Sequence, residues 1–349
     1  MGEGSTLKRI LILHTGGTFG MLEKEGVWKP NERISKDDLL SVVPELELLA
    51  QIDVVVPYIQ DSAELTLGHI NLLASTIADN RDAFDGFVVI HGTDTMAYSA
   101  SALSFMLAGL GKPVVFTGSQ RPFMQIRTDA KSNLINSVEI AASSFNEIAL
   151  FFGNKLLRGN RTTKVSTWKF EAFDSPNFPT LGEAGVNINF NLYPVGNPTL
   201  EAQEFQPFSK LRETVFVIHL FPGLQNTDLD FLLHNERIEA FIIVAYGAGN
   251  MPTGKDSGLV GFITLAIEQG KIVVIATQCT HGRVSLDIYE SARIVKQLRV
   301  LGCKDMTLEA AVMKLTYLLS RYDDDRQKVR TLFEMNIAGE ITDEHHIVR

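Results

Sequence analysis

Strand-like runs of β-branched and apolar residues alternate with helix-like stretches from Lys8 to about Asn154. The spacing of the apolar residues predicts helices over Asp37–Leu49, Gly68–Ala78, Met96–Leu110 and Lys131–Ser143, and a further strand over Glu147–Phe152. Such an alternation favours a largely parallel sheet with helices on both faces. We therefore expect an α/β protein whose larger, N-terminal domain has three layers and a mostly parallel sheet.

The character of the chain changes between Asn191 and Lys210, where prolines and glycines interrupt a polar stretch without a clear period. Strand-like runs then return at Thr214–Leu220, Ala240–Ala245 and Lys271–Ala276, separated by helical patterns at Leu229–His234 and Leu259–Glu268. A final helix is predicted over Leu308–Ser320. The sequence thus predicts an N-terminal domain over 1–190, a linker over 191–213 and a smaller three-layer α/β domain over 214–349.

Composition excludes several classes of function. The net charge of −9 argues against a nucleic-acid partner, which requires a basic surface. Neither of the two cysteines belongs to a C-x-x-C pair, and the eight histidines show no metal-binding spacing, so we expect no metal. The segment Met1–Lys8 lacks the pattern of a secretory signal, and no apolar stretch reaches the ~18 residues of a membrane span. We expect a cytoplasmic protein without a membrane partner.

Four short polar clusters each follow a strand-like run directly. They are Thr15-Gly16-Gly17-Thr18, Asp61-Ser62, His91-Gly92-Thr93-Asp94-Thr95 and Gly118-Ser119-Gln120. The carboxyl ends of parallel strands share one edge of a sheet, and ligands bind in the crevice there. We therefore expect the four clusters to meet in one pocket, whose hydroxyls and carboxylates indicate nucleophilic chemistry on a small polar substrate.

Each motif also has a purely structural interpretation. Two glycines after a strand are often only a tight turn, and Asp94 or Thr95 could cap a helix that begins near Met96. Lys164 lies in a cationic run that could be a solvated loop, although a buried lysine could instead relay a proton to a hydroxyl. The segment Tyr246–Asn250 could be a flexible connection after a strand of the second domain.

The motifs together resemble a known family. Thr-Gly-Gly-Thr at 15–18, His-Gly-Thr-Asp-Thr-Met at 91–96, Thr-Gly-Ser-Gln at 117–120, Gly-Asn-Arg-Thr-Thr-Lys at 159–164 and Tyr-Gly-Ala-Gly-Asn at 246–250 are similar in order and spacing to those of the bacterial-type L-asparaginases. The segments at 100–107 and 277–279 resemble the cytoplasmic type I branch. The resemblance covers essentially the whole chain.

The resemblance implies hydrolysis of L-asparagine to L-aspartate and ammonia through a threonine acyl-enzyme, without a cofactor. It assigns Thr18 as the nucleophile and Thr93 as the second catalytic threonine, with Lys164 linked to Thr93 through Asp94. It further implies a homo-oligomer, a dimer of dimers, with sites between subunits. The substrate-binding residues that it implies are Asp61, Ser62, Thr93, Asp94, Ser119 and, from a neighbouring subunit, Asn250.

Three positions depart from the family pattern. Trp28 stands at about the place where members usually carry a loop tyrosine that helps to activate the nucleophile. Ala63 stands where other members carry a side chain that can hydrogen-bond the substrate. The preference between asparagine and glutamine therefore stays open. Val244 stands where an arginine is expected, so we expect weak or absent allosteric binding of asparagine. Three alternatives therefore remain: a weakly active or non-catalytic amino-acid sensor, a glutaminase, and a subunit that feeds ammonia to a tRNA-linked partner.

Overall fold

The chain forms two compact units, residues 1–209 and 210–349. The computed structural model describes residues 7–24, 27–30, 35–191, 204–254, 258–287 and 290–342, and of 21–24, 27–30 and 290–292 only the backbone. Most of the expected linker, from 192 to 203, lies outside the described residues. The boundaries expected from the sequence stay a prediction.

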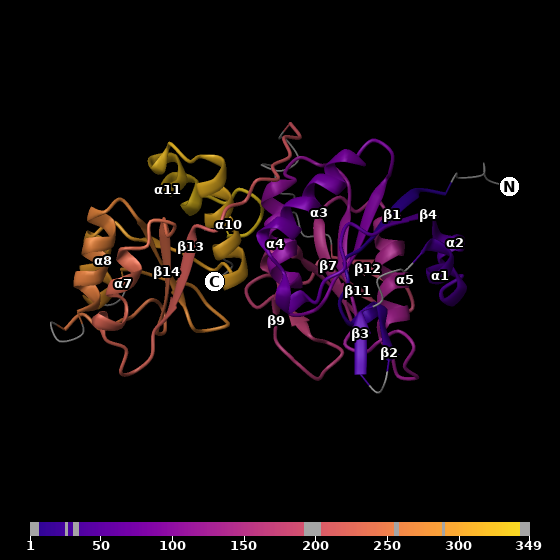
Figure 1. The fold of residues 1–349 in the computed structure, drawn as a ribbon, viewed down its shortest axis with the longest axis horizontal. Coiled ribbons are helices and arrows are strands. Elements are labelled where there is room, and N and C mark those ends of the chain that lie inside the picture. The colour runs from indigo at the N-terminus through magenta and orange to yellow at the C-terminus, as the bar shows by residue number, and fades with distance from the viewer. Residues whose placement is uncertain are drawn as a thin grey trace. The chain divides into compact units, whose positions relative to one another are not determined.

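The first unit is built on an eight-stranded sheet in the order β12-β11-β8-β7-β6-β5-β1-β4 (Figure 1). The strands β1, β4, β5, β6 and β7 pair in parallel, as the sequence pattern predicts. The other three are antiparallel, so the sheet is mixed. The eight strands are β1 (Arg9–His14), β4 (Gln51–Val55), β5 (Gly86–Ile90), β6 (Val114–Thr117), β7 (Ile148–Phe152), β8 (Lys155–Arg158), β11 (Gly182–Ala184) and β12 (Ile188–Phe190).

The switch to antiparallel pairing has a local cause. Only Gly153 and Asn154 separate β7 from β8, and Gly153 has a positive φ of 65°. A connection of two residues can only join antiparallel strands, because a parallel crossover needs a dozen residues or more.

Helices cover both faces of this sheet. In Figure 1, α3 (Leu67–Asp79) and α4 (Met96–Met106) lie on one side, and α1 (Lys36–Val42), α2 (Leu46–Leu49) and α5 (Ala130–Ala141) lie on the other. The sequence predicts one helix over 37–49, which is wrong: the helix is interrupted at Val43. Pro44 explains the interruption, because the residue before a proline is disfavoured in the helical region, and Val43 has φ −127° and ψ 66°.

Several short elements complete the first unit. The 3₁₀ turns are η1 (Thr18–Gly20), η2 (Ser62–Glu64) and η3 (Gly159–Arg161). Two antiparallel pairs stand apart from the main sheet, β2 (Met21–Lys24) with β3 (Val27–Pro30) and β9 (Thr163–Lys164) with β10 (Phe173–Asp174).

The second unit carries a four-stranded, wholly parallel sheet in the order β13-β14-β15-β16. Its strands are β13 (Val215–His219), β14 (Ala240–Ala245), β15 (Ile272–Thr277) and β16 (Leu301–Gly302). The central strands β14 and β15 are buried almost throughout, as expected where helices cover both faces. The remaining elements are η4 (Asn226–Asp228), α7 (Asp230–Leu233), α8 (Leu259–Glu268), α9 (Glu290–Gln297), α10 (Leu308–Arg321) and α11 (Arg326–Glu334). None of the helices in the described ranges has the length and apolar character needed to span a bilayer.

Candidate active site

The loops after β1, β4 and β5 meet at one edge of the first sheet. Gly16 forms a parallel bridge with Gln60, and a Cβ atom on Gly17 would lie 2.4 Å from the Cα of Gly92. Gly16 and Gly17 have φ values of 108° and 75°, which side chains rarely adopt. The two glycines therefore do more than turn the chain, because they allow the Thr18 loop to approach the loop after β5.

Ser62 joins the loop after β4 to the loop after β5. Its buried hydroxyl accepts a hydrogen bond from the backbone N–H of Asp94 at 3.3 Å, and its carbonyl accepts one from the hydroxyl of Thr95 at 2.8 Å. Thr95 precedes α4, yet its side chain makes no capping hydrogen bond. The capping interpretation of Thr95 is therefore wrong, since its hydroxyl links two loops of the site instead.

Lys164 is not part of a solvated loop. It ends the short strand β9, and its ammonium donates hydrogen bonds to Thr93 Oγ1 at 2.8 Å and to Asp94 Oδ1 at 2.6 Å. The Lys164 side chain is 18% exposed and that of Asp94 is 61% exposed. Thr93 itself is buried. An ammonium that bridges a threonine hydroxyl and a carboxylate can hold or relay a proton at that hydroxyl.

Thr18 begins the 3₁₀ turn η1 and is half-buried. The next residue, Phe19, is buried, packs against Phe123 with ring centroids 5.5 Å apart, and accepts a hydrogen bond from the Phe123 backbone. This apolar anchor holds the turn while leaving the Thr18 side chain outside the core.

Asp61 and Ser119 lie at the same edge of the sheet. Asp61 is exposed, and its carboxylate accepts a hydrogen bond from the N–H of Ala63 at 2.9 Å. Ser119 is buried, and its hydroxyl has no hydrogen-bond partner in the described part of the chain. The loop around Ser119 is held by Asn133, whose side chain donates to the carbonyl of Gly118 at 3.0 Å. A carboxylate and a serine segment are thus available beside the threonines.

Three further residues singled out from the sequence lie in other elements of the chain. Asn250 closes a tight turn of the second unit, in which Tyr246 and Asn250 exchange backbone hydrogen bonds of 2.9 and 2.7 Å. Its role therefore stays a prediction. Trp28 belongs to β3, and its side chain lies outside the described residues. Val244 is buried in the central strand β14 of the second unit, and the weak allostery expected from it is untested.

Two buried histidines lie at the candidate site: His91 begins one of the four polar clusters predicted from the sequence, and His14, which directly precedes the first cluster, was not singled out. His91 contacts the carbonyl of Gly92 through Nδ1 at 2.8 Å and the hydroxyl of Ser99 through Nε2 at 2.9 Å. Burial lowers the pKa of His14 and of His91 to about 4, so both rings are neutral at pH 7. His14 directly precedes the first polar cluster, and His91 is the first residue of the third. These positions are the signal in the sequence that the two rings pack beneath the loops of the site.

A half-buried tyrosine lies on the β4 side. Tyr58 packs against His69 with ring centroids 4.7 Å apart, and burial raises the pKa of its hydroxyl above the ordinary value. Among the described residues, no group of three or more histidine, cysteine, aspartate or glutamate side chains could hold a metal ion. The candidate site described here offers hydroxyls, one ammonium and carboxylates.

Comparison with known proteins identifies this arrangement. The family model for the asparaginase N-terminal domain matches residues 9–195, and the model for the glutaminase/asparaginase C-terminal domain matches residues 214–333. The chain belongs to the asparaginase family. Its N-terminal family domain thus contains every site residue described above except Asn250.

Individual relatives agree with this family. L-asparaginase 1 of Escherichia coli K12 is 38% identical over 343 residues, which cover 96% of this chain and 98% of that protein. The crystal structure of L-asparaginase I from Vibrio cholerae is similar, with a TM-score of 0.85, 37% identity and coverage of 97% of this chain and 100% of that chain. A glutamyl-tRNA(Gln) amidotransferase component of Pyrococcus abyssi is 30% identical over 96% of this chain and 77% of that protein. The relatives support an L-asparaginase, and they show that the family also includes proteins named for another amide chemistry.

Proposed function

We propose that this member of the asparaginase family hydrolyses L-asparagine to L-aspartate and ammonia through an acyl-enzyme on Thr18. The observation that carries the proposal is the bridge from the Lys164 ammonium to Thr93 Oγ1 and Asp94 Oδ1, on a loop that abuts the Thr18 turn. A threonine hydroxyl is a poor nucleophile without a positioned base or proton relay. The hydroxyl–ammonium–carboxylate group supplies such a relay.

The first half of the reaction forms the ester. The Thr18 oxygen attacks the side-chain carboxamide carbon, and its proton passes to the departing nitrogen as the C–N bond breaks and ammonia leaves. The oxyanion of the tetrahedral intermediate needs preorganised donors, and we assign the backbone N–H of Thr93 to this role. Loss of one such donor typically costs about 3 kcal/mol of transition-state stabilisation.

The second half of the reaction releases the product. Water attacks the aspartyl ester and gives a proton back to Thr18 as the ester bond breaks, with Thr93 and Lys164 positioned to assist. The zwitterionic ends of the substrate require a carboxylate for the ammonium and donors for the carboxylate. Asp61 and Asp94, with Ser62, offer these groups, while the backbone at Ser119 faces the carboxamide and Asn250 comes from a neighbouring subunit in a dimer of dimers. We propose no cofactor, and we place the enzyme in the cytoplasm.

The proposal is tested by ammonia release from L-asparagine and from L-glutamine by the wild type and Thr18→Ala. We expect Thr18→Ala to lower kcat at least about 10³-fold, because removal of a covalent nucleophile costs up to about 10⁶-fold in a hydrolase. Thr76→Ala is the matched control, since Thr76 lies in α3 and its hydroxyl donates to the carbonyl of Leu72 in the same helix. Equal activity of Thr18→Ala and wild type would exclude Thr18 as the nucleophile.

The same assay separates the alternatives. A higher kcat/KM for L-glutamine would identify a glutaminase, for which Ala63 is the motivating feature. Binding of L-aspartate without turnover of either amide would identify a sensor. Rapid acid quenching during turnover of L-asparagine is expected to leave an aspartyl adduct on the peptide that contains Thr18.

A further inference from the structure

The first unit has a hollow that begins at Gln120, the residue after Ser119, and that the proposed hydrolysis does not use. A cavity of about 540 Å³ lies between the segment that begins at Gln120 and the loop between β9 and β10. An adjoining cavity of about 450 Å³ shares Trp168, Lys169 and Glu171 with it. We call the two cavities together the Trp168 groove. The first cavity is lined by Gln120, Arg121, Arg127, Thr167, Trp168, Lys169, Phe170 and Glu171.

The walls of the groove are held by hydrogen bonds. The side-chain amide of Gln120 donates to the carbonyl of Lys169 at 3.1 Å, and the Ser166 hydroxyl accepts the backbone N–H groups of Trp168 and Lys169 at 3.3 and 3.0 Å. The backbone N–H groups of Gln120 and Arg121 donate to the carboxylate of Asp129. The loop that carries the tryptophan is therefore braced against the opposite wall, which is a precondition for a preformed site.

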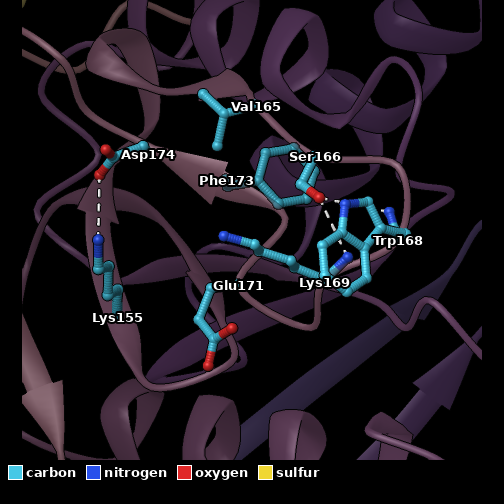
Figure 2. A pocket seen from close by; sticks show the side chains of 8 residues that line it. All are labelled: Lys155, Val165, Ser166, Trp168, Lys169, Glu171, Phe173 and Asp174. Atoms are coloured by element: carbon cyan, nitrogen blue, oxygen red, sulfur yellow. Dashed lines mark hydrogen bonds and ion pairs between the residues drawn. The ribbon is translucent and has the colours of Figure 1, made fainter.

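Two arginines in the wall of the groove have no ion-pair partner among the described residues. Arg121 and Arg127 make no ion pair in the part of the chain that the structure describes, whereas Lys155 on the same side of the unit is paired with Asp174 at 3.2 Å. Figure 2 shows that pair at one side of the adjoining cavity, the Trp168 indole at the other, and the Lys169 side chain reaching between them. Such a cluster is unexpected in a chain with a net charge of −9, so it favours an anionic ligand.

The groove also presents a flat apolar surface. Trp168 is 80% exposed, and Phe170 is 36% exposed. The ammonium of Lys169 lies 5.7 Å from the centroid of the Trp168 ring. An exposed indole can stack with a planar ring, and the nearby Glu171 carboxylate can accept hydrogen bonds from hydroxyl or amino groups.

We propose that the Trp168 groove binds a small nucleoside phosphate. Arg121 and Arg127 hold the phosphate groups, because a guanidinium matches phosphate with two parallel hydrogen bonds. The base stacks on Trp168, and Glu171 contacts the hydroxyl or amino groups of the nucleoside. This site is separate from the residues assigned to hydrolysis, so its existence does not depend on the proposed function.

The chain offers a selective probe for this binding. It has only two tryptophans, so Trp28→Phe leaves Trp168 as the single fluorescent indole. The full-length Trp28→Phe protein is titrated with ADP, with adenosine and with pyrophosphate at physiological salt, and fluorescence is excited at the red edge of the tryptophan band. We expect saturable quenching by ADP and at least tenfold weaker binding of adenosine and of pyrophosphate.

Variants in the same background identify the residues. Arg121→Gln and Arg127→Gln are each expected to weaken ADP binding at least tenfold, while Arg237→Gln is the matched control, since that exposed arginine belongs to the second unit. The proposal is overturned if ADP gives no saturable signal up to about 1 mM, the weak end of specific binding. It is equally overturned if both arginine variants bind as tightly as the control, or if pyrophosphate competes as well as ADP, which would reveal an anion patch without recognition of the ring.

Discussion

The two units each contain a lysine–carboxylate pair, and the two pairs differ in almost every physical respect. Lys164 and Asp94 of the first unit are 18% and 61% exposed, and the Lys164 ammonium bonds one hydroxyl and one carboxylate oxygen. Lys314 and Glu340 of the second unit are both fully buried. One pair faces the place where substrate is proposed to bind, and the other faces only protein.

The buried pair has its hydrogen-bonding capacity filled. The Lys314 ammonium donates to Glu340 and to the carbonyls of Phe333 and Met335, and the Glu340 carboxylate also accepts the N–H groups of Ile337 and Ala338. Burial lowers the pKa of Lys314, and the charge of Glu340 opposes that shift. Full satisfaction makes this pair a structural tie between α10 and the segment after α11.

The Lys164–Asp94 pair does not use all of the N–H donors of its ammonium in the described structure. An ammonium has three donors, and in the described structure two of those of Lys164 are used. Both lysines have a carboxylate partner, so the partner alone does not decide their roles. The difference is that the Lys164 ammonium has an N–H donor that is not used in the described structure and its side chain is partly exposed to solvent, whereas the Lys314 ammonium is buried with all three donors used.

The largest effect is expected at the buried pair. Lys314→Met leaves the Glu340 carboxylate uncompensated, so the free energy of unfolding should fall by about 3–5 kcal/mol. The activity per folded molecule should stay unchanged. Denaturant unfolding and active-site titration measure the two quantities. The double variant Lys314→Met/Glu340→Leu should recover a large part of the loss, and a single variant as stable as wild type would refute the structural role.

The opposite pattern is expected at the exposed pair. Lys164→Met should lower kcat for L-asparagine at least about 100-fold, which is the lower range of a general acid–base contribution. Its free energy of unfolding should change by less than about 1 kcal/mol, because its carboxylate partner Asp94 is 61% exposed and solvent screens the pair. Steady-state kinetics measure kcat, and denaturant unfolding measures the free energy of unfolding. An unchanged kcat would exclude the proton relay.

The buried histidines predict a loss of stability in acid. Their folded-state pKa of about 4 lies below the ordinary 6.5, so from pH 6.5 downward the unfolded chain binds protons that the native chain does not. The contribution of the two neutral histidines to the free energy of unfolding is fully present above pH 6.5 and is lost as the pH falls toward 4. At pH 5 the loss is about 2 kcal/mol for each histidine. His14→Phe places an apolar ring beside Phe19. This variant should lose about 2 kcal/mol less unfolding free energy than the wild type between pH 7 and pH 5. A variant with the wild-type pH profile would contradict this.

The smallest effect is expected at a third pair. Lys155 and Asp174 lie 3.2 Å apart but are 32% and 40% exposed. Lys155→Met should therefore change the free energy of unfolding by less than about 1 kcal/mol, because solvent screens the pair. Thermal and denaturant unfolding measure it. A loss as large as that of Lys314→Met would show that pairing alone, and not burial, sets the contribution.

The outline of the fold followed from periodicity, with informative exceptions. The alternation of apolar runs and helical patterns predicts the parallel strands of both units except β16, and it predicts the helices except α9 and α11. It misses the break at Pro44, where the steric clash between the proline ring and Val43 overrides the amphipathic pattern. It also misses the antiparallel strands β11 and β12, because segments of three residues are too short to show a period.

The sequence predicts which residues form the candidate site, and it does not predict their contacts. The sequence by itself determined which polar clusters follow strands, because strand polarity places their carboxyl ends at one edge, and its motifs determined the family. Only the tertiary structure decided that Lys164 bonds Thr93 and Asp94, that Thr95 links to Ser62, and that Arg121 and Trp168 line one groove. These contacts join residues far apart in the chain, and their distances depend on how strands and loops pack, which no local pattern of residues encodes.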